Sequence, residues 1–519
     1  MKKKLFRVSL SGIALCAILF SGCKKDYSND DDHGYNGHSN NNQGNNKIDL
    51  EFYAMADGIT LDKFSTKYPG KAKKSVKISG LQSGEKLLAI DFRPATGQLY
   101  GVGATSRIYV VNPATGAARM IGATPFTPAI NGSIVGFDFN PTVDRIRLVT
   151  STGQNLRLNP ETGGVAFTDG NINLAGQNPM LAAVAYENAI AGATTTTLYA
   201  IDLASKKLFR INPPNNGTLE EVGSLGLNIS GEGGYDIDGP SNTGLAIFKV
   251  NGRTTLFTVD DETAKTKVLA TYYKNYSAIA IPTQDVAYAA SAMNTLLIFN
   301  PNSSDAPVAK PFTGLSAGET VIGLDMRPVN GQLYALGSGS HIYTINASSG
   351  AAAFVGPLST NLSGSDFGFD FNPVVDRIRI VSNTGQNLRV NPADAVAIVD
   401  GPINPGGRAI TAVAYLNNFA GATSTVLFDI DVTTDKLYRQ DPSNAGTLVE
   451  VGNLGVNVEA MSGFDIGGTS NSGYALLKSG STTNLYRVNV TSFSSSSNIL
   501  TFKRSFPSSV TGFTLGLGF

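Results

Sequence analysis

Six aspartates share one position of a repeated four-residue pattern, and their carboxylates are the groups of this chain best suited to chemistry. The pattern is a small residue, an apolar residue, then Asp, Ala or Thr, then another apolar residue, and it occurs ten times at intervals of 44 to 51 residues. Its third position is aspartate at Asp91, Asp138, Asp236, Asp325, Asp370 and Asp465. Carboxylates gathered by such a repeat could bind a cation such as Ca²⁺ and serve a lyase, hydrolase or lactonase.

The same repeat predicts the elements that position these aspartates. After each of the first nine tetrads come turn residues and two or three short runs of alternating apolar residues, which indicate a four-stranded antiparallel sheet. The 57 glycines and the charged fraction of only 15% fit turn-rich β-structure. We therefore predict an all-β protein, a β-propeller of ten four-stranded blades with the tetrads as inner strands.

A small residue heads every tetrad, which suits strands that converge on a crowded axis. A larger side chain there would clash with the neighbouring blade. The ten heads are Ala89, Gly136, Ala183, Gly234, Ala278, Gly323, Gly368, Ala412, Gly463 and Gly512.

The number of rings is left open by the sequence. The third tetrad position repeats with a period of five units, which favours two copies of one design, residues 50–284 and 285–519. The last tetrad, at 512–515, has no outer strands after it, and residues 50–80 have no inner strand before them, so we expect the two chain ends to complete one blade. The tetrad at 278–281 could close the first copy in the same way, giving two five-bladed rings, or could continue into one ten-bladed ring.

The aspartates also have a structural interpretation. Three carboxylates close together in a narrow ring would repel one another, and they would need protons, basic partners or a cation. Alternatively, each Asp accepts backbone N–H groups or pairs with an arginine. The candidate pairs are Arg93 with Asp91, Arg327 with Asp325, and Arg145 or Arg147 with Asp138.

Two arginine pairs recur in the two copies. Arg145 and Arg147 lie two residues apart, as do Arg377 and Arg379, so each pair would share one face of a strand. They could bind a carboxylate or phosphate. Because an aspartate precedes each pair, ion pairs between blades are the favoured interpretation.

No catalytic residue can be assigned from the remaining motifs. Only His33, His38 and His341 are present, so neither a His-ligated metal site nor serine–histidine machinery is indicated. Paired acids could perform glycosidic acid–base work, but such pairs arise by chance among 40 acids. They are Asp236/Asp238, Asp260/Asp261 and Asp429/Asp431. No cofactor is expected except, as an alternative, Ca²⁺.

The N-terminus predicts export and lipidation. Basic residues precede an apolar stretch at 8–20 that is too short for a permanent membrane span, so residues 1–22 are predicted to be a signal peptide. The segment 19–23 resembles a bacterial lipobox, which makes Cys23 the expected lipidated N-terminus. Residues 23–49 then form a disordered tether. We expect a lipoprotein of the outer membrane, facing the periplasm or the cell surface.

Charge excludes one class of partner. The 40 Lys plus Arg balance the 40 Asp plus Glu, and four of the basic residues lie in the predicted signal peptide. The mature chain is therefore mildly acidic, which disfavours nucleic-acid binding.

The most similar stretches of the two copies carry a resemblance to a known family. Residues 136–160 and 368–392 agree at 20 of 25 positions, including Gly-Phe-Asp-Phe-Asn-Pro, Asp-Arg-Ile-Arg and Thr-Gly-Gln-Asn-Leu-Arg. These phrases resemble a bacterial family known only as domain of unknown function 4394, in two tandem copies. The resemblance implies a secreted or lipid-anchored, propeller-like protein and supplies no activity, cofactor or catalytic residue.

Three functional hypotheses follow. The first is a non-enzymatic, lipid-anchored propeller whose loops recognise a glycan, a peptide or a protein. The second is a Ca²⁺-dependent lyase, hydrolase or lactonase acting from the aspartate cluster. The third is a structural component of a surface assembly.

Overall fold

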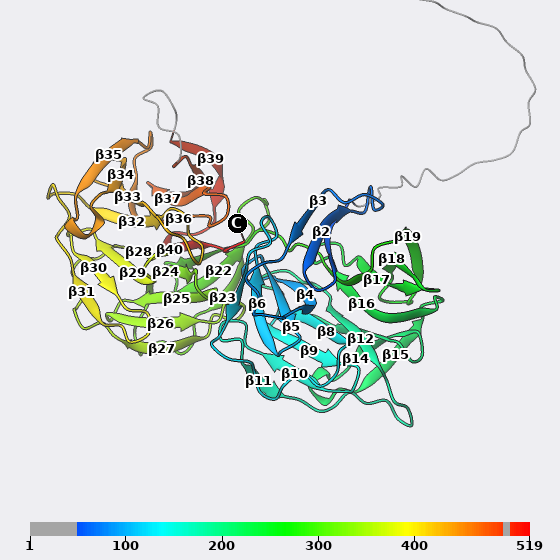
Figure 1. Cartoon of the computed structure of the whole chain (residues 1–519). Helices are drawn as coiled ribbons and strands as arrows, with labels where there is room; N and C mark the ends of the chain where they lie inside the picture. Colours follow the sequence, from blue (N-terminus) through cyan, green and yellow to red (C-terminus); the bar gives the residue numbers. More distant parts are fainter. Residues whose placement is uncertain (1–48, 491–498, 519) are drawn as a thin grey trace, which may run out of the picture. The chain divides into compact units, whose positions relative to one another are not determined.

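The computed structural model describes residues 49–490 and 499–518 (Figure 1). These residues form ten four-stranded antiparallel sheets, as predicted, and two short 3₁₀ turns, η1 (Pro214–Asn216) and η2 (Ser443–Ala445). Among the described residues, no helix has the length and apolar character needed to cross a membrane. The predicted signal peptide, Cys23 and nearly all of the predicted tether lie outside the described residues.

Five sheets form what we call the first ring. Its blades, each written from the inner strand outward, are β20 (Tyr276–Ala280), β1 (Glu51–Ala56), β2 (Thr60–Ser65) and β3 (Lys74–Lys77); β4 (Leu87–Arg93), β5 (Gln98–Gly103), β6 (Arg107–Val111) and β7 (Ala118–Ile121); β8 (Val135–Asn140), β9 (Arg145–Thr150), β10 (Asn155–Leu158) and β11 (Val165–Thr168); β12 (Leu181–Tyr186), β13 (Leu198–Asp202), β14 (Lys207–Ile211) and β15 (Leu219–Ser224); β16 (Ile229–Ile237), β17 (Gly244–Val250), β18 (Arg253–Val259) and β19 (Thr266–Tyr272).

The other five sheets form the second ring. Its blades are β40 (Val510–Leu515), β21 (Ala287–Ser291), β22 (Thr295–Phe299) and β23 (Val308–Pro311); β24 (Val321–Arg327), β25 (Gln332–Gly337), β26 (His341–Ile345) and β27 (Ala352–Pro357); β28 (Phe367–Asn372), β29 (Arg377–Ser382), β30 (Asn387–Val390) and β31 (Ala397–Val399); β32 (Ile410–Tyr415), β33 (Leu427–Asp431), β34 (Lys436–Gln440) and β35 (Leu448–Asn453); β36 (Glu459–Ile466), β37 (Gly473–Ser479), β38 (Thr482–Val488) and β39 (Leu500–Phe506).

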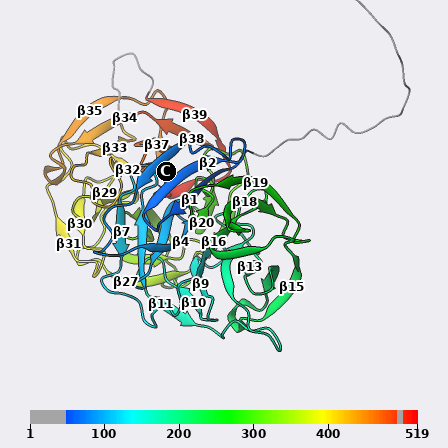
Figure 2. The same cartoon turned by 45° about the vertical axis from the view of Figure 1, so that its right-hand side comes forward.

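Strand pairing closes each copy on itself (Figures 1 and 2). The last strand of the first copy, β20, pairs with β1, and the last strand of the second copy, β40, pairs with β21. In each ring the five inner strands contact one another in an unbroken circle. The molecule therefore contains two five-bladed propellers, and a single ten-bladed ring is excluded. The expectation that the two chain ends complete one blade is wrong, because each copy removes its own exposed sheet edges.

The small tetrad heads lie where inner strands approach most closely. A Cβ atom on Gly136 would lie 2.9 Å from the backbone nitrogen of Val184, on the next inner strand. A Cβ on Gly512 would lie 2.7 Å from the backbone nitrogen of Leu324. Backbone cannot move aside for these contacts, so Gly136 and Gly512 cannot be replaced even by alanine, and the crowding agrees with the prediction that small residues head the tetrads.

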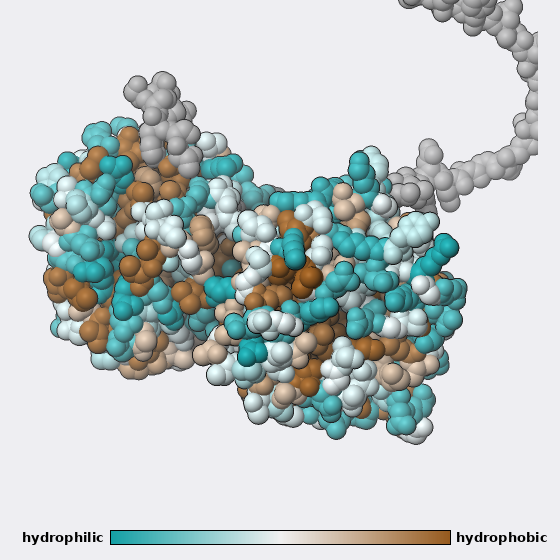
Figure 3. Space-filling view, viewed as in Figure 1, coloured by the Kyte–Doolittle hydropathy of each residue, from teal (hydrophilic) through white to brown (hydrophobic). Residues whose placement is uncertain are grey.

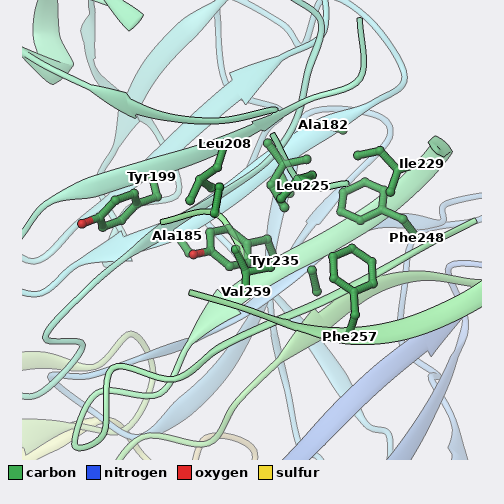
Figure 4. Close-up of a cluster of buried hydrophobic side chains, with 14 of the residues drawn as sticks. Ala182, Ala185, Tyr199, Leu208, Leu225, Ile229, Tyr235, Phe248, Phe257 and Val259 are labelled. Carbon is green, nitrogen blue, oxygen red and sulfur yellow. The ribbon is translucent and has the colours of Figure 1, made fainter. Parts of the chain in front are cut away.

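The hydrophobic core is divided into clusters between adjacent blades. One cluster lies between the fourth and fifth blades of the first ring and packs Tyr199 and Leu208 against Tyr235, Phe248 and Phe257 (Figure 4). Burying each such side chain contributes about 1.5–3 kcal/mol.

On the face shown in Figure 3, hydrophilic residues are interspersed with smaller hydrophobic areas.

Candidate functional site

The six predicted aspartates meet in two groups of three, one in each ring. Asp91, Asp138 and Asp236 form the first axial triad, in which one carboxylate oxygen from each residue lies within 4.8 Å of the others. Asp325, Asp370 and Asp465 form the second axial triad with the same spacing. All six side chains are buried. The repeat therefore brings together residues that lie far apart in the sequence.

Strand alternation explains this position. The first and third tetrad residues point to the same face of the inner strand, and that face is turned toward the next inner strand of the ring. Each aspartate consequently accepts a hydrogen bond from a backbone N–H of the next blade. In the first ring the acceptor–donor pairs are Asp91 with Phe139 (2.8 Å), Asp138 with Tyr186 (3.0 Å) and Asp236 with Ile281 (2.5 Å).

The second ring repeats this arrangement. Its pairs are Asp325 with Phe371 (2.7 Å), Asp370 with Tyr415 (3.1 Å) and Asp465 with Leu515 (2.6 Å). Each carboxylate therefore ties its own blade to its neighbour. This agrees with the structural interpretation in which each aspartate accepts backbone N–H groups.

Burial of the axial aspartates and repulsion between their carboxylates raise their pKa values, so the triads retain protons at higher pH than exposed aspartates do. Burial, and next the Asp236 carboxylate, raise the pKa of Asp91 well above its usual range. Burial, followed by Asp91 and Asp236, does the same to the pKa of Asp138. Burial raises the pKa of Asp236 to about 7, and that of Asp465 in the second ring also to about 7. At neutral pH each triad therefore carries fewer than three negative charges.

The triads can also be tested as cation sites. Ca²⁺ takes six to eight oxygen ligands at about 2.3–2.6 Å, so three oxygens within 4.8 Å of one another could surround an ion. They would supply only half of its ligands, and several carboxylate oxygens are already used by backbone N–H groups. Each triad therefore provides some, but not all, of the oxygen ligands that a bound Ca²⁺ ion requires.

The second axial triad has a further member, Thr514. Its hydroxyl oxygen lies 2.8 Å from Asp325 Oδ1 and 3.0 Å from Asp465 Oδ2. In the first ring the same tetrad position is Ala280. Two small cavities near the second axis measure about 10 and 20 Å³.

The predicted arginine partners of the aspartates are wrong. Arg93 forms a buried ion pair with Asp144 instead of Asp91, with Nε 2.8 Å from Oδ1, and it also pairs with Glu161. Likewise, Arg327 pairs with Asp376 of the following blade. The physical reason is that these long side chains cross to the next blade, whereas the axial aspartates already accept backbone N–H groups.

The two arginine pairs do not form anion clamps. Arg147 is buried, forms an ion pair with Asp169 at 2.7 Å and donates to Asn215 of the next blade at 2.9 Å. Arg379 makes the corresponding contacts with Asp400 and Asn444. The other members of the pairs, Arg145 and Arg377, donate to the backbone carbonyls of Asp144 and Asp376. Asp169 and Asp400 belong to the same blades as Arg147 and Arg379, so the predicted ion pairs between blades are wrong for these arginines, which reach the next blade through Asn215 and Asn444.

A second candidate site was missed by the sequence argument. A groove of about 940 Å³, here called the side groove, lies between the fourth and fifth blades of the first ring. Its lining includes Glu187, Tyr199, Arg210, Glu220 and Asp261. Of the acid pairs considered, only Asp260/Asp261 lies here, and Asp260 serves a turn by accepting the Thr263 N–H. An alignment of the two copies would have indicated the groove, because Glu187 and Asp261 stand opposite Leu416 and Val490.

These observations define the class of protein: two tandem five-bladed β-propellers with buried acidic axes. A family model described as a domain of unknown function, DUF4394, matches residues 60–281 and 295–509. The chain therefore belongs to the DUF4394 family. No curated protein matches the sequence.

Two of the solved structures to which the chain is similar are a bacterial surface component and a bacterial extracellular domain. One is PorZ, a surface component of the type IX secretion system of Porphyromonas gingivalis, with 13% identity, a TM-score of 0.25, and coverage of 88% of this chain and 57% of that one. Another is the extracellular domain of a hybrid two-component system of B. thetaiotaomicron, with 10% identity, a TM-score of 0.26, and coverage of 88% and 66%. The chain spans less than two thirds of either structure's length.

Proposed function

We propose that this protein is a non-enzymatic binding protein of the bacterial cell envelope that recognises its ligand away from the ring axes. The observation that carries the proposal is the hydrogen bonding of the axial carboxylates, each of which accepts a backbone N–H from the next blade. A carboxylate that ties two blades together is poorly placed to act on a substrate. The cavities of about 10 and 20 Å³ near the second axis are of the size of a single water.

Membrane anchoring is the part of this proposal that rests on the sequence. Cys23 follows a basic and apolar segment typical of an exported lipoprotein. The Cys23→Ala variant should be released from the membrane fraction. Protease treatment of intact cells that express the wild-type protein decides between the periplasm and the cell surface, because only a surface-exposed protein is digested. A variant that stays with the membranes would contradict the lipid anchor.

The alternative is a Ca²⁺-dependent lyase, hydrolase or lactonase, and the spacing of the triad oxygens is the observation in its favour. Thermal unfolding with Ca²⁺ and with a chelator separates the two functions. A site that binds the ion only in the folded state raises Tm with ion concentration. The binding function predicts the same Tm in both conditions, whereas a large rise with Ca²⁺ that Asp138→Asn abolishes would favour the enzyme.

A further inference from the structure

The side groove has the dimensions of a ligand site. Its volume of about 940 Å³ falls in the range of about 300–1,000 Å³ usual for small-molecule sites. The fourth blade contributes Glu187, Tyr199, Arg210 and Glu220, and the fifth contributes Asp261. Strands hold Tyr199, Arg210 and Glu220, whereas Glu187 and Asp261 lie in the connections that follow β12 and β18.

The second ring shows that folding does not require these polar groups. At the equivalent place, Phe428, Phe464 and Val490 belong to one hydrophobic cluster, with Leu416 packed against it. The first ring has Tyr199, Tyr235, Asp261 and Glu187 at the same four positions. Burying polar groups costs free energy that apolar residues avoid. Because the same pair of blades forms with apolar residues, the polar set of the first ring points to a ligand.

The polar groups of the groove support one another. Tyr235 is almost fully buried and donates its hydroxyl hydrogen to Asp261 Oδ1. The guanidinium of Arg210 lies over the Tyr199 ring, 5.6 Å from its centroid. Figure 4 shows the hydroxyls of Tyr199 and Tyr235 directed to the same side of their cluster. Asn212 also donates to Glu220, at 3.0 Å. Donors and acceptors are thus held in fixed positions, as a specific polar site requires.

The mixture of charges narrows the class of ligand. Carboxylates, among them Glu187, Glu220 and Asp261, line the groove together with the basic groups of Arg210, Lys265 and Lys267. A ligand of either charge would meet groups of its own sign. A hydroxyl group, in contrast, donates to a carboxylate and accepts from a guanidinium or amide. We infer that the side groove binds a neutral saccharide; this rests on the proposed function, in which the ligand is recognised away from the axes.

The test begins with the full-length mature protein, solubilised in detergent, on an array of neutral oligosaccharides. The best saccharide of the array is then titrated by calorimetry against the wild type and a triple variant, Glu187→Leu, Glu220→Val and Asp261→Val, which carries the residues of the second ring. We expect binding to weaken at least about tenfold, because the variant removes three carboxylates that would accept charge-assisted hydrogen bonds from the saccharide hydroxyls. A Tm measurement verifies that the triple variant is folded.

A matched control separates the groove from general surface charge. Glu221 is the neighbour of Glu220 on β15, lies outside the groove lining and pairs with Lys207 at 2.8 Å. Glu221→Val should bind as the wild type does. Should the triple variant fail to fold, the single change Glu220→Val at an exposed residue still tests the groove.

Two outcomes would overturn the inference. One is an array on which no saccharide binds above background, and the other is a Glu220→Val or triple variant that binds as tightly as the wild type. The proposed function is contradicted by different results: a Cys23→Ala variant that stays with the membranes, or a large rise of Tm with Ca²⁺. The two failures can therefore be told apart.

Discussion

The two axes hold the same three aspartates but differ in the residue beside them. In the first ring, the methyl group of Ala280 occupies the third position of the closing strand, β20. In the second ring, Thr514 of β40 is hydrogen-bonded to both Asp325 and Asp465. The difference shows that the triad itself, and not its surroundings, is the common feature of the two propellers.

Thr514 has a single hydroxyl proton, and its contacts with two carboxyl groups require a second proton in the second axial triad. Thr514 can donate to only one carboxylate, so the other contact is made only if that carboxyl group is protonated and donates to the threonine. Burial and the neighbouring Asp465 raise the pKa of Asp325 well above its usual range, and burial raises the pKa of Asp465 to about 7, so the second triad holds at least one proton near neutral pH. The first ring has no such hydroxyl at this position and must accommodate its protons through its carboxyl groups and backbone alone.

A second difference lies between the third and fourth blades of the two rings. Ala200 of the first ring lies in a hydrophobic cluster, and its counterpart in the second ring is Asp429. Asp429 pairs across the sheet with Val413 and Tyr438, which belong to the equivalent cluster. Neither of its carboxylate oxygens has a hydrogen-bond partner among the described residues. The buried carboxyl group of Asp429 therefore destabilises the second ring, whereas Ala200 places no polar group at this position of the first ring.

The largest expected effect tests what the rings share, their crowded axes. A Cβ on Gly368 would lie 2.8 Å from the backbone nitrogen of Val413, so Gly368→Ala should lower the free energy of unfolding by about 3 kcal/mol. Urea unfolding measures this loss. Gly406→Ala is the matched control, because a Cβ there meets nothing within 4 Å. Equal stability of the two variants would contradict a close-packed axis.

The contrast between local and distant contacts explains what the sequence could predict. The tetrad repeat predicted the inner strands and the six axial aspartates, because alternation and spacing are local properties. It could not decide the ring closure, since the pairing of β20 with β1 joins strands more than 200 residues apart. The partner of Arg93 was missed for a similar reason: Asp144 lies on the next blade. The side groove combines residues of two blades, and only a comparison of the copies could indicate it.

Thr514→Ala converts the second axis to the composition of the first. It removes a hydroxyl that lies between two buried carboxyl groups, and we expect a loss of about 2 kcal/mol in urea unfolding. The reciprocal change, Ala280→Thr, is the control and should not reproduce this loss. A fully stable Thr514→Ala variant would mean that the two axes do not differ in their hydrogen bonding.

The axes should also make stability depend on pH in the same direction in both rings. Burial raises the pKa of Asp236 and of Asp465 from 3.8 to about 7 in the folded state. The folded state then binds more protons than the unfolded state, so the contribution is present in full below pH 3.8 and is lost as pH rises toward 7. Asp236→Asn and Asp465→Asn should each flatten this decline in unfolding free energy. A decline that neither variant changes would contradict protonated axes.

Asp429→Ala should act in the opposite direction and stabilise the protein. The change gives the second ring the alanine of the first and removes a buried carboxyl group, for a gain of about 1.5 kcal/mol. The gain should be smaller at acid pH. Burial raises the pKa of Asp429 well above 3.8, so the buried carboxyl group destabilises the folded state most at a pH that favours its ionised form. Ala200→Asp in the first ring is the mirror experiment and should destabilise.

The smallest effect is expected where the rings differ most in polarity, at the side groove. Tyr235→Phe restores the residue of the second ring, Phe464, and keeps the packing of the ring against Tyr199 and Phe257. It should therefore change the free energy of unfolding by about 1 kcal/mol or less. Burial raises the pKa of Asp261 to about 7 while the Tyr235 hydroxyl opposes the rise, so losing that hydroxyl should move the pKa higher. If the variant keeps the stability of the wild type but binds saccharide more weakly, the Tyr235–Asp261 pair serves binding and not folding. A large loss of stability would show instead that the first ring needs this polar pair to fold, whereas the second ring folds without one.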